Sequence, residues 1–288
     1  MKNKDFTIFI ISHGRADNVR TLKTLQTSGY TGSVYIVIDN EDKSAENYKA
    51  IHSDKVIMFD KKAIADTTDE GDNFNDRRTT THARNAVFNI AKDLGITYFL
   101  VLDDDYTGFG YRFDDKLSYG YKTVHKLDGV LDAMLDYYKR VPNLLALCMA
   151  QGGDYMGGAN GSSGYVNELK PRRKAMNTFI CSTERPFKFV GHLNEDVNTY
   201  VSIGNRGGLF LTIPNVSVSQ VATQSSTGGM TEMYLDSGTY VKSFYTVMYQ
   251  PSSVKIITMG QTHRRIHHSI KWKNTVPVLL DEKYKKSN

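Results

Sequence analysis

The first half of the chain alternates short apolar runs with segments whose apolar residues recur at helical spacing. The apolar runs predict β-strands at residues 7–12, 33–38, 55–59 and 96–102. The helical spacing predicts helices at residues 18–26, 44–51 and 81–94. Strands and helices that alternate in this order predict an α/β fold, with a largely parallel sheet, right-handed crossovers and helices on its faces.

The second half is less regular and predicts a mixture of helices and strands. Helices are expected at residues 127–138, 195–203 and 231–249, the last one despite Gly238. Strands are expected at residues 144–150, 178–182, 208–213, 216–221 and 254–259. No Pro- or Gly-rich linker divides the chain, so we expect a single domain over residues 1–288.

Two long polar segments interrupt this pattern. Residues 60–78 are too many for a simple connection and predict a lid or a binding loop. Residues 151–164 contain six glycines and must form a loop. Both are expected to lie near a functional site, since long loops in compact domains are commonly functional.

Composition sets only broad bounds on the function. The formal charge of +5 is a mild basic excess, concentrated at residues 170–174 and in the last 26 residues, and it is compatible with an anionic partner. Cys148 and Cys181 each lie in an apolar run, which predicts buried thiols in a reducing cytoplasm. No run has the length of a membrane span or the form of a signal peptide, so we expect a soluble cytoplasmic protein without membrane contact.

The strongest chemical signal is the apolar strand that runs directly into Asp103, Asp104 and Asp105. Three adjacent carboxylates repel one another unless a cation or hydrogen-bond donors compensate them. Open α/β sheets bind their ligands at the carboxyl ends of strands. The pattern therefore indicates a divalent metal site, and the alternative is a solvated aspartate turn.

Three other strand or helix ends carry polar groups. Arg15 follows the first strand, and Asp39 and Asp42 follow the second, where a carboxylate can accept hydrogen bonds from a base or a ribose. Arg84 lies at the start of a helix and suits phosphate charge. Taken singly, these residues have structural alternatives as caps, turn residues or surface residues.

Together these motifs resemble the nucleotide-sugar half of GT-A fold glycosyltransferases. The resemblance rests on Ser-His-Gly-Arg (12–15), Asp-Asn-Glu-Asp (39–42), Ala-Arg-Asn (83–85) and Leu-Asp-Asp-Asp (102–105), and it covers about residues 7–112. More narrowly, residues 11–18 with 103–106 and 111–112 resemble the TET-associated glycosyltransferases. Those are phage-type enzymes thought to glycosylate hydroxymethylated pyrimidines in DNA.

The resemblance implies a GT-A-like fold with a nucleotide-sugar half (residues 1–112) and a less regular acceptor half (residues 113–288). It implies a nucleoside diphosphate sugar donor, expected to be a UDP-sugar, and Mn²⁺ or Mg²⁺ held by Asp103 and Asp105. A late histidine is expected as a further metal ligand: His263, with His267 and His268 as alternatives. The residues expected to bind the donor are Ser12, His13, Arg15, Asp39, Asp42, Arg84, Asn85 and Asp104.

For the acceptor half, the resemblance points to Glu195 and Asp196 as the acids that deprotonate or orient the acceptor hydroxyl. Acids in a first helical turn also suit the helix dipole without any catalytic role. The residues expected to contact DNA are Lys170, Arg172, Arg173, Lys174, Arg264 and Arg265. Arg77 and Arg78 are further candidates for this basic surface, and Tyr155, Tyr165 and Trp272 are expected to stack on bases. Such charges are commonly only a solvated surface.

Other functions remain as alternatives. The acceptor is otherwise a glycan, a protein or a small molecule. A nucleotidyltransferase would also use a parallel sheet with metal-binding acids, but residues 12–15 are too short and glycine-poor for its phosphate loop. A non-catalytic nucleic-acid-binding protein on a decayed enzyme fold is disfavoured, because Asp103, Asp105, Glu195 and Asp196 are all retained.

Overall fold

The structure is a computed structural model that describes the chain except for residues 117, 152–173, 222–229, 239, 261–263 and 278–288. In the first half the elements are β1 (Phe6–Ile11), η1 (Ala16–Asn18), α1 (Arg20–Thr27), β2 (Ser33–Asp39), α2 (Ala45–His52), η2 (Ser53–Lys55), β3 (Val56–Phe59), α3 (Lys61–Ala65), α4 (Thr81–Asp93) and β4 (Tyr98–Asp103). In the second half they are β5 (Tyr106–Phe113), β6 (Tyr119–Thr123), α5 (Leu127–Arg140), β7 (Leu144–Gln151), β8 (Thr178–Ser182), α6 (Glu195–Asn205), β9 (Leu209–Gln220), α7 (Thr231–Ser237), α8 (Val241–Tyr249), β10 (Val254–Met259), β11 (Arg265–Ile270) and η5 (Trp272–Asn274).

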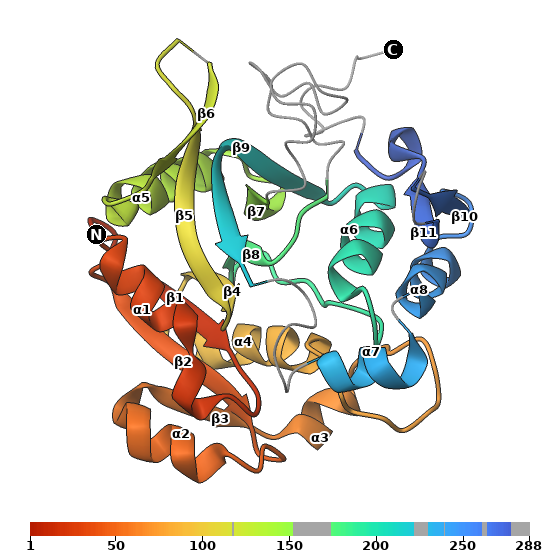
Figure 1. The fold of residues 1–288 in the computed structure, drawn as a ribbon, viewed down its shortest axis with the longest axis horizontal. Helices are drawn as coiled ribbons and strands as arrows, with labels where there is room; N and C mark the ends of the chain where they lie inside the picture. Colours follow the sequence, from red (N-terminus) through yellow and green to blue (C-terminus); the bar gives the residue numbers. More distant parts are fainter. Residues whose placement is uncertain (117, 152–173, 222–229, 239, 261–263, 278–288) are drawn as a thin grey trace.

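A nine-stranded sheet runs through the molecule in the order β3-β2-β1-β4-β8-β7-β9-β5-β6 (Figure 1). The four strands of the first half are parallel neighbours, and β7 and β9 also pair in parallel. Strands β8 and β5 pair antiparallel to both of their neighbours and so run against the rest. The mostly parallel sheet between helices confirms the α/β, GT-A-like architecture predicted from the sequence.

Helices cover both faces of this sheet. Along β1, Ile8 and Ile10 belong to the core beneath α1, α2 and α5, whereas Phe9 and Ile11 belong to the core beneath α4 and α6. All four side chains are buried, which explains why this strand is a continuous apolar run without polar alternation.

The register aligns the carboxyl ends of three strands. Ile11 at the end of β1 pairs with Val37 of β2 and with Asp103 of β4. The polar residues that follow these strands are therefore brought to a single edge of the sheet, as expected from the parallel order.

Two predictions about the second half were wrong. Residues 208–213 and 216–221 form the single strand β9, and its pairing with β7 passes from Ile213 to Ser217 across Pro214. A proline within a strand is tolerated at such an irregularity because it cannot donate to the ladder. The helix predicted over residues 231–249 is two helices, α7 and α8, because Gly238 adopts a φ of +78° that no α-helix accommodates.

Three strands, β5, β6 and β11, were not predicted. Strands β5 and β6 form a hairpin that extends from the body of the molecule (Figure 1), and β11 pairs antiparallel with β10. Gly110 obscures the pattern of β5, but a Cβ at this position would collide with the ring of Tyr121 on β6. The glycine is therefore a packing requirement of the hairpin.

The structure also bears on the cysteines and on membrane-spanning segments. Cys148 and Cys181 are both buried and free, as the sequence predicted. Among the described residues, no helix has the length and apolar character needed to cross a membrane.

Candidate active site

A pocket of about 700 Å³ opens where β1, β2 and β4 end. It extends to the first turns of α4 and α6 and to α7 and α8. It brings together these residues predicted from the sequence: Ser12, His13, Arg15, Asp39, Asp42, Arg84, Asp103, Asp104, Asp105, Glu195 and Asp196. Residues more than 180 positions apart thus share a single cavity.

The turn that carries Asp103, Asp104 and Asp105, here called the acidic turn, is held by α1. Thr21, which is fully buried, donates from Oγ1 to the carbonyl oxygen of Asp103 at 2.6 Å and accepts from the backbone N–H of Tyr106 at 2.9 Å. The Thr21 N–H also donates to the carbonyl oxygen of Asp104 at 3.1 Å. The acidic turn is therefore fixed on both sides by Thr21, a residue that no sequence motif marks.

Asp104 faces the first turn of the chain. Its Oδ2 accepts from Ser12 Oγ at 2.5 Å, and its Oδ1 accepts from Arg15 Nη1 at 2.8 Å. Tyr48 on α2 adds its hydroxyl, which lies 2.6 Å from Ser12 Oγ and accepts from the Arg15 N–H at 2.9 Å. Asp104, predicted to bind the donor, here connects the turn after β1 to the acidic turn.

The other two carboxylates of the acidic turn are less well compensated. Burial raises the pKa of Asp103 to about 7; Arg84 opposes this shift, and Asp105 and Glu195 add to it. Burial also raises the pKa of Asp105, and Asp104 adds to that effect. Asp103 is still 26% exposed and both residues line the pocket, so a cation has access to them.

These two carboxylates fit a divalent cation. No group of three or more His, Cys, Asp or Glu side chains within the described ranges is placed to hold a metal. Mg²⁺ in nucleotide sites is commonly held by one or two carboxylates, with substrate phosphates and water as its other ligands. Asp103 and Asp105 provide the two carboxylates of such a site. A cation would relieve the repulsion between them, which together with burial raises their pKa values.

A second polar group lies at the end of β2. Asp39 Oδ2 is 2.8 Å from His13 Nδ1 and 3.4 Å from Lys61 Nζ. Burial opposes ionisation of Asp39, but the His13 hydrogen bond and the Lys61 charge outweigh it and lower the Asp39 pKa. The same hydrogen bond raises the pKa of His13, whose side chain is 44% exposed. His13 thus presents an accessible polar ring to the pocket.

Asp42 has a structural role in the same region. Its Oδ2 accepts from the Gly14 N–H at 2.8 Å, and its Oδ1 accepts from the Ser44 N–H at 2.7 Å. Gly14 has a φ of +69°, which a glycine adopts without strain. Asp42 therefore fixes the turn that presents His13 and Arg15.

The two α4 residues predicted to bind the donor differ in their surroundings. Arg84 lines the pocket, and its Nη2 lies 3.1 Å from Asp103 Oδ1. Asn85 exchanges two hydrogen bonds with the backbone of Phe189, at 2.8 and 3.0 Å, and does not line the pocket. Asn85 joins α4 to the segment that precedes α6.

The acidic pair of α6 also lines the pocket. Glu195 and Asp196 occupy the first helical turn after Asn194, whose φ of 62° is left-handed. Glu195 Oε1 accepts from Thr80 Oγ1 at 2.6 Å. Burial raises the pKa of Asp196 to about 6; Glu195 adds to this shift and Arg84 opposes it.

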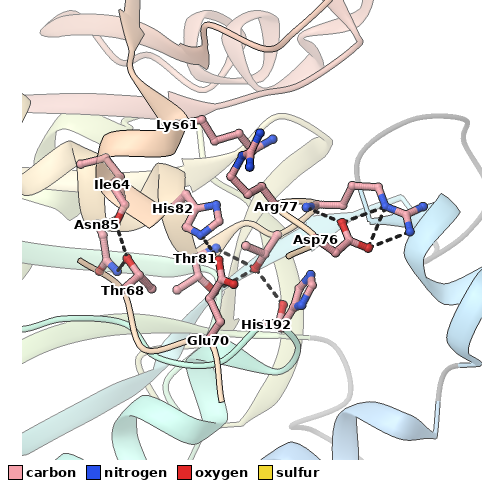
Figure 2. A network of polar contacts seen from close by, with 12 residues as sticks. Lys61, Ile64, Thr68, Glu70, Asp76, Arg77, Thr81, His82, Asn85 and His192 are labelled. Carbon is pink, nitrogen blue, oxygen red and sulfur yellow. Dashed lines mark hydrogen bonds and ion pairs between the residues drawn. The ribbon is translucent and has the colours of Figure 1, made fainter. Parts of the chain in front are cut away.

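Residues 66–80, here called the bridging segment, make up most of the loop predicted at residues 60–78. The backbone of this segment bonds to the segment before α6, from Gly191 N–H to Asp69 O at 2.7 Å and from His192 N–H to Glu70 O at 2.9 Å. Figure 2 shows Glu70 in contact with His82, whose Nε2 lies 2.5 Å from Glu70 Oε1. These contacts connect the two halves of the chain.

The carboxyl end of the bridging segment reaches the pocket. Arg78 and Thr79 line the pocket together with Thr80. Arg78 also pairs with Asp76 at 2.8 Å and with Asp236 of α7 at 2.6 Å. The loop therefore contributes to the pocket wall, as a binding loop would, and a lid movement remains a prediction.

The predicted DNA contacts and the late metal ligand are only partly within the described residues. Lys170, Arg172, Arg173, His263, Tyr155, Tyr165 and the glycine-rich loop at residues 152–164 lie outside them. Arg264 and Arg265 are exposed at the start of β11, and Lys174 is partly buried. Burial lowers the pKa of His267, and it lowers the pKa of His268 to about 4, with Lys242 and Lys174 adding to both shifts. Neither histidine lines the pocket.

Sequence reasoning missed several pocket residues on the acceptor side, among them Tyr234 and Lys242. Lys242 lies 5.5 Å from the ring of Tyr234, and its charge acts on Asp196. They lie on α7 and α8, which the sequence had predicted as one helix. No local motif marks Tyr234 or Lys242. Both reach the pocket from helices that are separate because the chain breaks at Gly238.

The fold and the pocket together define a GT-A-like enzyme with an acidic turn at the ends of parallel strands. Residues 6–229 match the model of the TET-associated glycosyltransferase family, and the chain belongs to that family. It is therefore a glycosyltransferase, which sets aside the nucleotidyltransferase and the non-catalytic binding protein. No curated protein is significantly similar to it in sequence.

Solved structures with a similar chain path are distant in sequence. Glucosyl-3-phosphoglycerate synthase from Mycobacterium tuberculosis, in complex with Mg²⁺ and UDP, superposes with a TM-score of 0.48 at 6% identity, over 92% of this chain and 87% of that one. S. aureus TarS 1-349 gives a TM-score of 0.44 at 11% identity, over 74% of this chain and 60% of that one. The same TarS fragment in complex with UDP-GlcNAc gives 0.44 at 10% identity, over 84% and 66%.

Proposed function

We propose that this glycosyltransferase transfers a sugar from a UDP-sugar to the hydroxymethyl group of a modified pyrimidine in DNA, with Mn²⁺ or Mg²⁺ at the acidic turn. The observation that carries the proposal is the pocket itself. It is lined by Asp103 and Asp105, which we assign to the cation, by His13 and Asp39, which we assign to the nucleoside, and by Asp196, which we assign to the acceptor hydroxyl. Its volume of about 700 Å³ lies within the range of small-molecule sites.

The donor nucleoside is expected at the tips of β1 and β2. Asp39 keeps a low pKa and so remains a hydrogen-bond acceptor for a base or for ribose hydroxyls. His13 is accessible and oriented by Asp39, so it can donate or stack at the same place. The diphosphate then extends towards Asp103 and Asp105, which would hold the cation. When bound, the cation would neutralise the charge that develops on the diphosphate leaving group.

Asp196 is the better candidate for the residue that takes the acceptor proton. Both acids line the pocket, but Glu195 is engaged by the side chains of Thr80 and Arg84, whereas Asp196 accepts from the Val197 N–H at 2.7 Å. In the transfer, the acceptor oxygen bonds to the anomeric carbon, and the bond from that carbon to the diphosphate oxygen breaks with its electron pair. The hydroxyl proton passes to the Asp196 carboxylate, whose raised pKa suits a general base near neutral pH.

DNA as the acceptor is supported by the resemblance of the motifs and by the basic residues of the acceptor half. Arg264, Arg265 and Lys174 are positioned by the structure, and Lys170, Arg172 and Arg173 are added from the sequence. A base within a duplex would have to be flipped out of the stack to reach the pocket. Modification of DNA would take place in the cytoplasm, that of the host cell if a phage encodes the enzyme.

The test is incubation of the protein with DNA containing 5-hydroxymethylcytosine or 5-hydroxymethyluracil and a panel of UDP-sugars, in Mn²⁺ or in EDTA. Digestion and mass spectrometry of the nucleosides should show one hexose or pentose added in Mn²⁺ only. Unmodified DNA of the same sequence is the control. Release of UDP without any change in nucleoside mass would place the acceptor elsewhere, on a glycan, a protein or a small molecule.

A further inference from the structure

Arg84 has a location that differs from that of a phosphate-binding arginine. Its side chain is only 3% exposed, and its guanidinium carbon lies 5.0 Å from the ring centre of Phe179 and 5.6 Å from that of Phe189. An arginine that receives a solvated diphosphate is expected to extend into the pocket. Arg84 is instead packed against aromatic rings, where stacking restricts the plane of the guanidinium.

The charge of Arg84 is directed at two carboxylates from different halves of the chain. Nη2 lies 3.1 Å from Asp103 Oδ1 on the acidic turn, and Nε lies 3.4 Å from Glu195 Oε1 on α6. Both carboxylates, with Asp196, help to raise the Arg84 pKa against the effect of burial. A buried cation is stable only when such partners compensate its lost hydration.

The ion pairing of Arg84 with Asp103 and Glu195 is incomplete. We infer that the strength of these two pairs can change. Nη1 and Nε are buried and have no hydrogen-bond partner among the described residues, although Nε remains within ion-pair distance of Glu195. Glu195 Oε1 already accepts from Thr80 Oγ1 at 2.6 Å, so the same oxygen is shared by Thr80 and Arg84. Buried donors without partners are rare and require an explanation.

We propose that Arg84 is a positioning residue that couples the donor side of the pocket to the acceptor side, through Asp103 and Glu195, and that it does not bind the donor phosphates. With a cation held by Asp103, Arg84 would no longer be needed to compensate that carboxylate. Arg84 would then pair more strongly with Glu195 and so fix the first turn of α6, which carries Asp196. The proposal rests on the proposed function, because it assumes a donor and a cation at the acidic turn.

The test compares Arg84→Met, which keeps the length of the side chain and removes its charge, with Arg84→Lys, which keeps a charge that can reach only one partner. UDP binding is measured by calorimetry without metal, and hydrolysis of a UDP-sugar by water is measured in Mn²⁺. We expect the UDP dissociation constant to stay within about twofold in both variants. The kcat for hydrolysis should fall about 10²-fold in Arg84→Met, as expected for misplaced reacting groups, and less in Arg84→Lys.

A double-mutant cycle tests the pathway through Glu195. If Arg84 acts through Glu195, adding Glu195→Gln to Arg84→Met should cost little further kcat, and the two losses should not multiply. The matched control is Arg185→Met, because Arg185 also stacks on an aromatic ring, at 4.0 Å from Tyr138, but does not line the pocket. That control should lower stability and leave kcat unchanged.

Two results would overturn the proposal. A rise of tenfold or more in the UDP dissociation constant of Arg84→Met would show that Arg84 binds the phosphates. If the kcat losses of Arg84→Met and Glu195→Gln multiply in the double variant, Arg84 does not act through Glu195. If the wild-type protein binds no UDP even in Mn²⁺, the proposed function fails instead. The same double-mutant cycle is then measured as the free energy of unfolding in urea, on the unliganded protein. Losses of stability from Arg84→Met and Glu195→Gln that simply add would overturn the coupling between these two residues.

Discussion

At the scale of single residues, the pocket contains carboxylates whose pKa values are raised by burial and by one another. Asp103, at about 7, is compensated only in part by Arg84. A site that holds excess negative charge without a ligand is adapted to a cation, at a cost to the stability of the unliganded protein.

Asp103→Asn should separate function from stability. We expect it to reduce transfer about 10²–10³-fold by removing charge stabilisation, without lowering the free energy of unfolding near neutral pH. The folded pKa of Asp103 is raised from 3.8 to about 7, so in this window the unfolded chain loses the proton more readily than the folded protein, and stability falls as pH rises. The variant should lack that loss in urea unfolding between pH 4 and pH 7. Near-normal turnover of Asp103→Asn in Mn²⁺ would refute the metal assignment.

Asp196 gives a prediction about the pH dependence of the reaction. A general base acts in its deprotonated form, so kcat should rise with pH up to about 6 and then level off. Asp196→Asn should lower kcat about 10²–10⁴-fold and abolish that acidic limb. Asp136→Asn is a suitable control, because Asp136 is exposed on α5 and does not line the pocket. An acidic limb with the same midpoint in Asp196→Asn would exclude Asp196 as the base.

At the scale of elements, sequence patterns predicted the first half well for a physical reason. Its central strands β1 and β4 are largely buried and so form continuous apolar runs, and glycines end two of its helices. The hairpin of β5 and β6 gave no such pattern, because all of β6 is exposed and Gly110 interrupts β5. The break between α7 and α8 at Gly238 was missed because a glycine within an apolar helical pattern does not reveal its φ angle.

The same limit applies to the site. Residues that follow strands, such as Asp39 and Asp103, are marked by their sequence neighbours, since strand ends converge at one edge of the sheet. Lys242 and Thr21 are marked only by tertiary contacts, to the pocket and to the acidic turn respectively. Asn85 was predicted to bind the donor from its motif, yet its amide is used to hold the backbone of Phe189.

The role of α1 as the support of the acidic turn is testable with Thr21→Val, which keeps the shape of the side chain and removes its hydroxyl. The Tyr106 N–H and the Asp103 carbonyl would lose a buried partner, at about 1–3 kcal/mol of unfolding free energy. Hydrolysis of the UDP-sugar should fall as well, because the carboxylates are no longer held in place. Thr27→Val, at an exposed position of α1, is the matched control. Unchanged stability of Thr21→Val in urea would contradict this role.

At the scale of the whole molecule, the donor side and the acceptor side of the pocket come from different halves of the chain. The bridging segment joins them through Glu70, His82 and His192 (Figure 2). The described basic residues of the acceptor half include Lys174, Lys242, Arg264 and Arg265. Burial lowers the pKa values of His267 and His268, and the charges of Lys242 and Lys174 add to this effect, which indicates a positive potential on this side.

If DNA binds on that side, its affinity should depend steeply on salt, because phosphate contacts release counterions. Arg264→Gln with Arg265→Gln should weaken binding of hydroxymethylated duplex DNA and reduce the slope of log affinity against log salt by about one unit for each lost phosphate contact. The dissociation constant for UDP should not change, since neither arginine lines the pocket.

Lys23→Gln with Lys49→Gln, on exposed positions of α1 and α2, is the control. It removes the same charge from the nucleotide half and should leave DNA binding unaltered. Fluorescence anisotropy from 50 to 300 mM salt, about the range over which such slopes are resolved, measures all three proteins. Equal slopes in both double variants would mean that the net charge of the protein, and not this surface, attracts DNA.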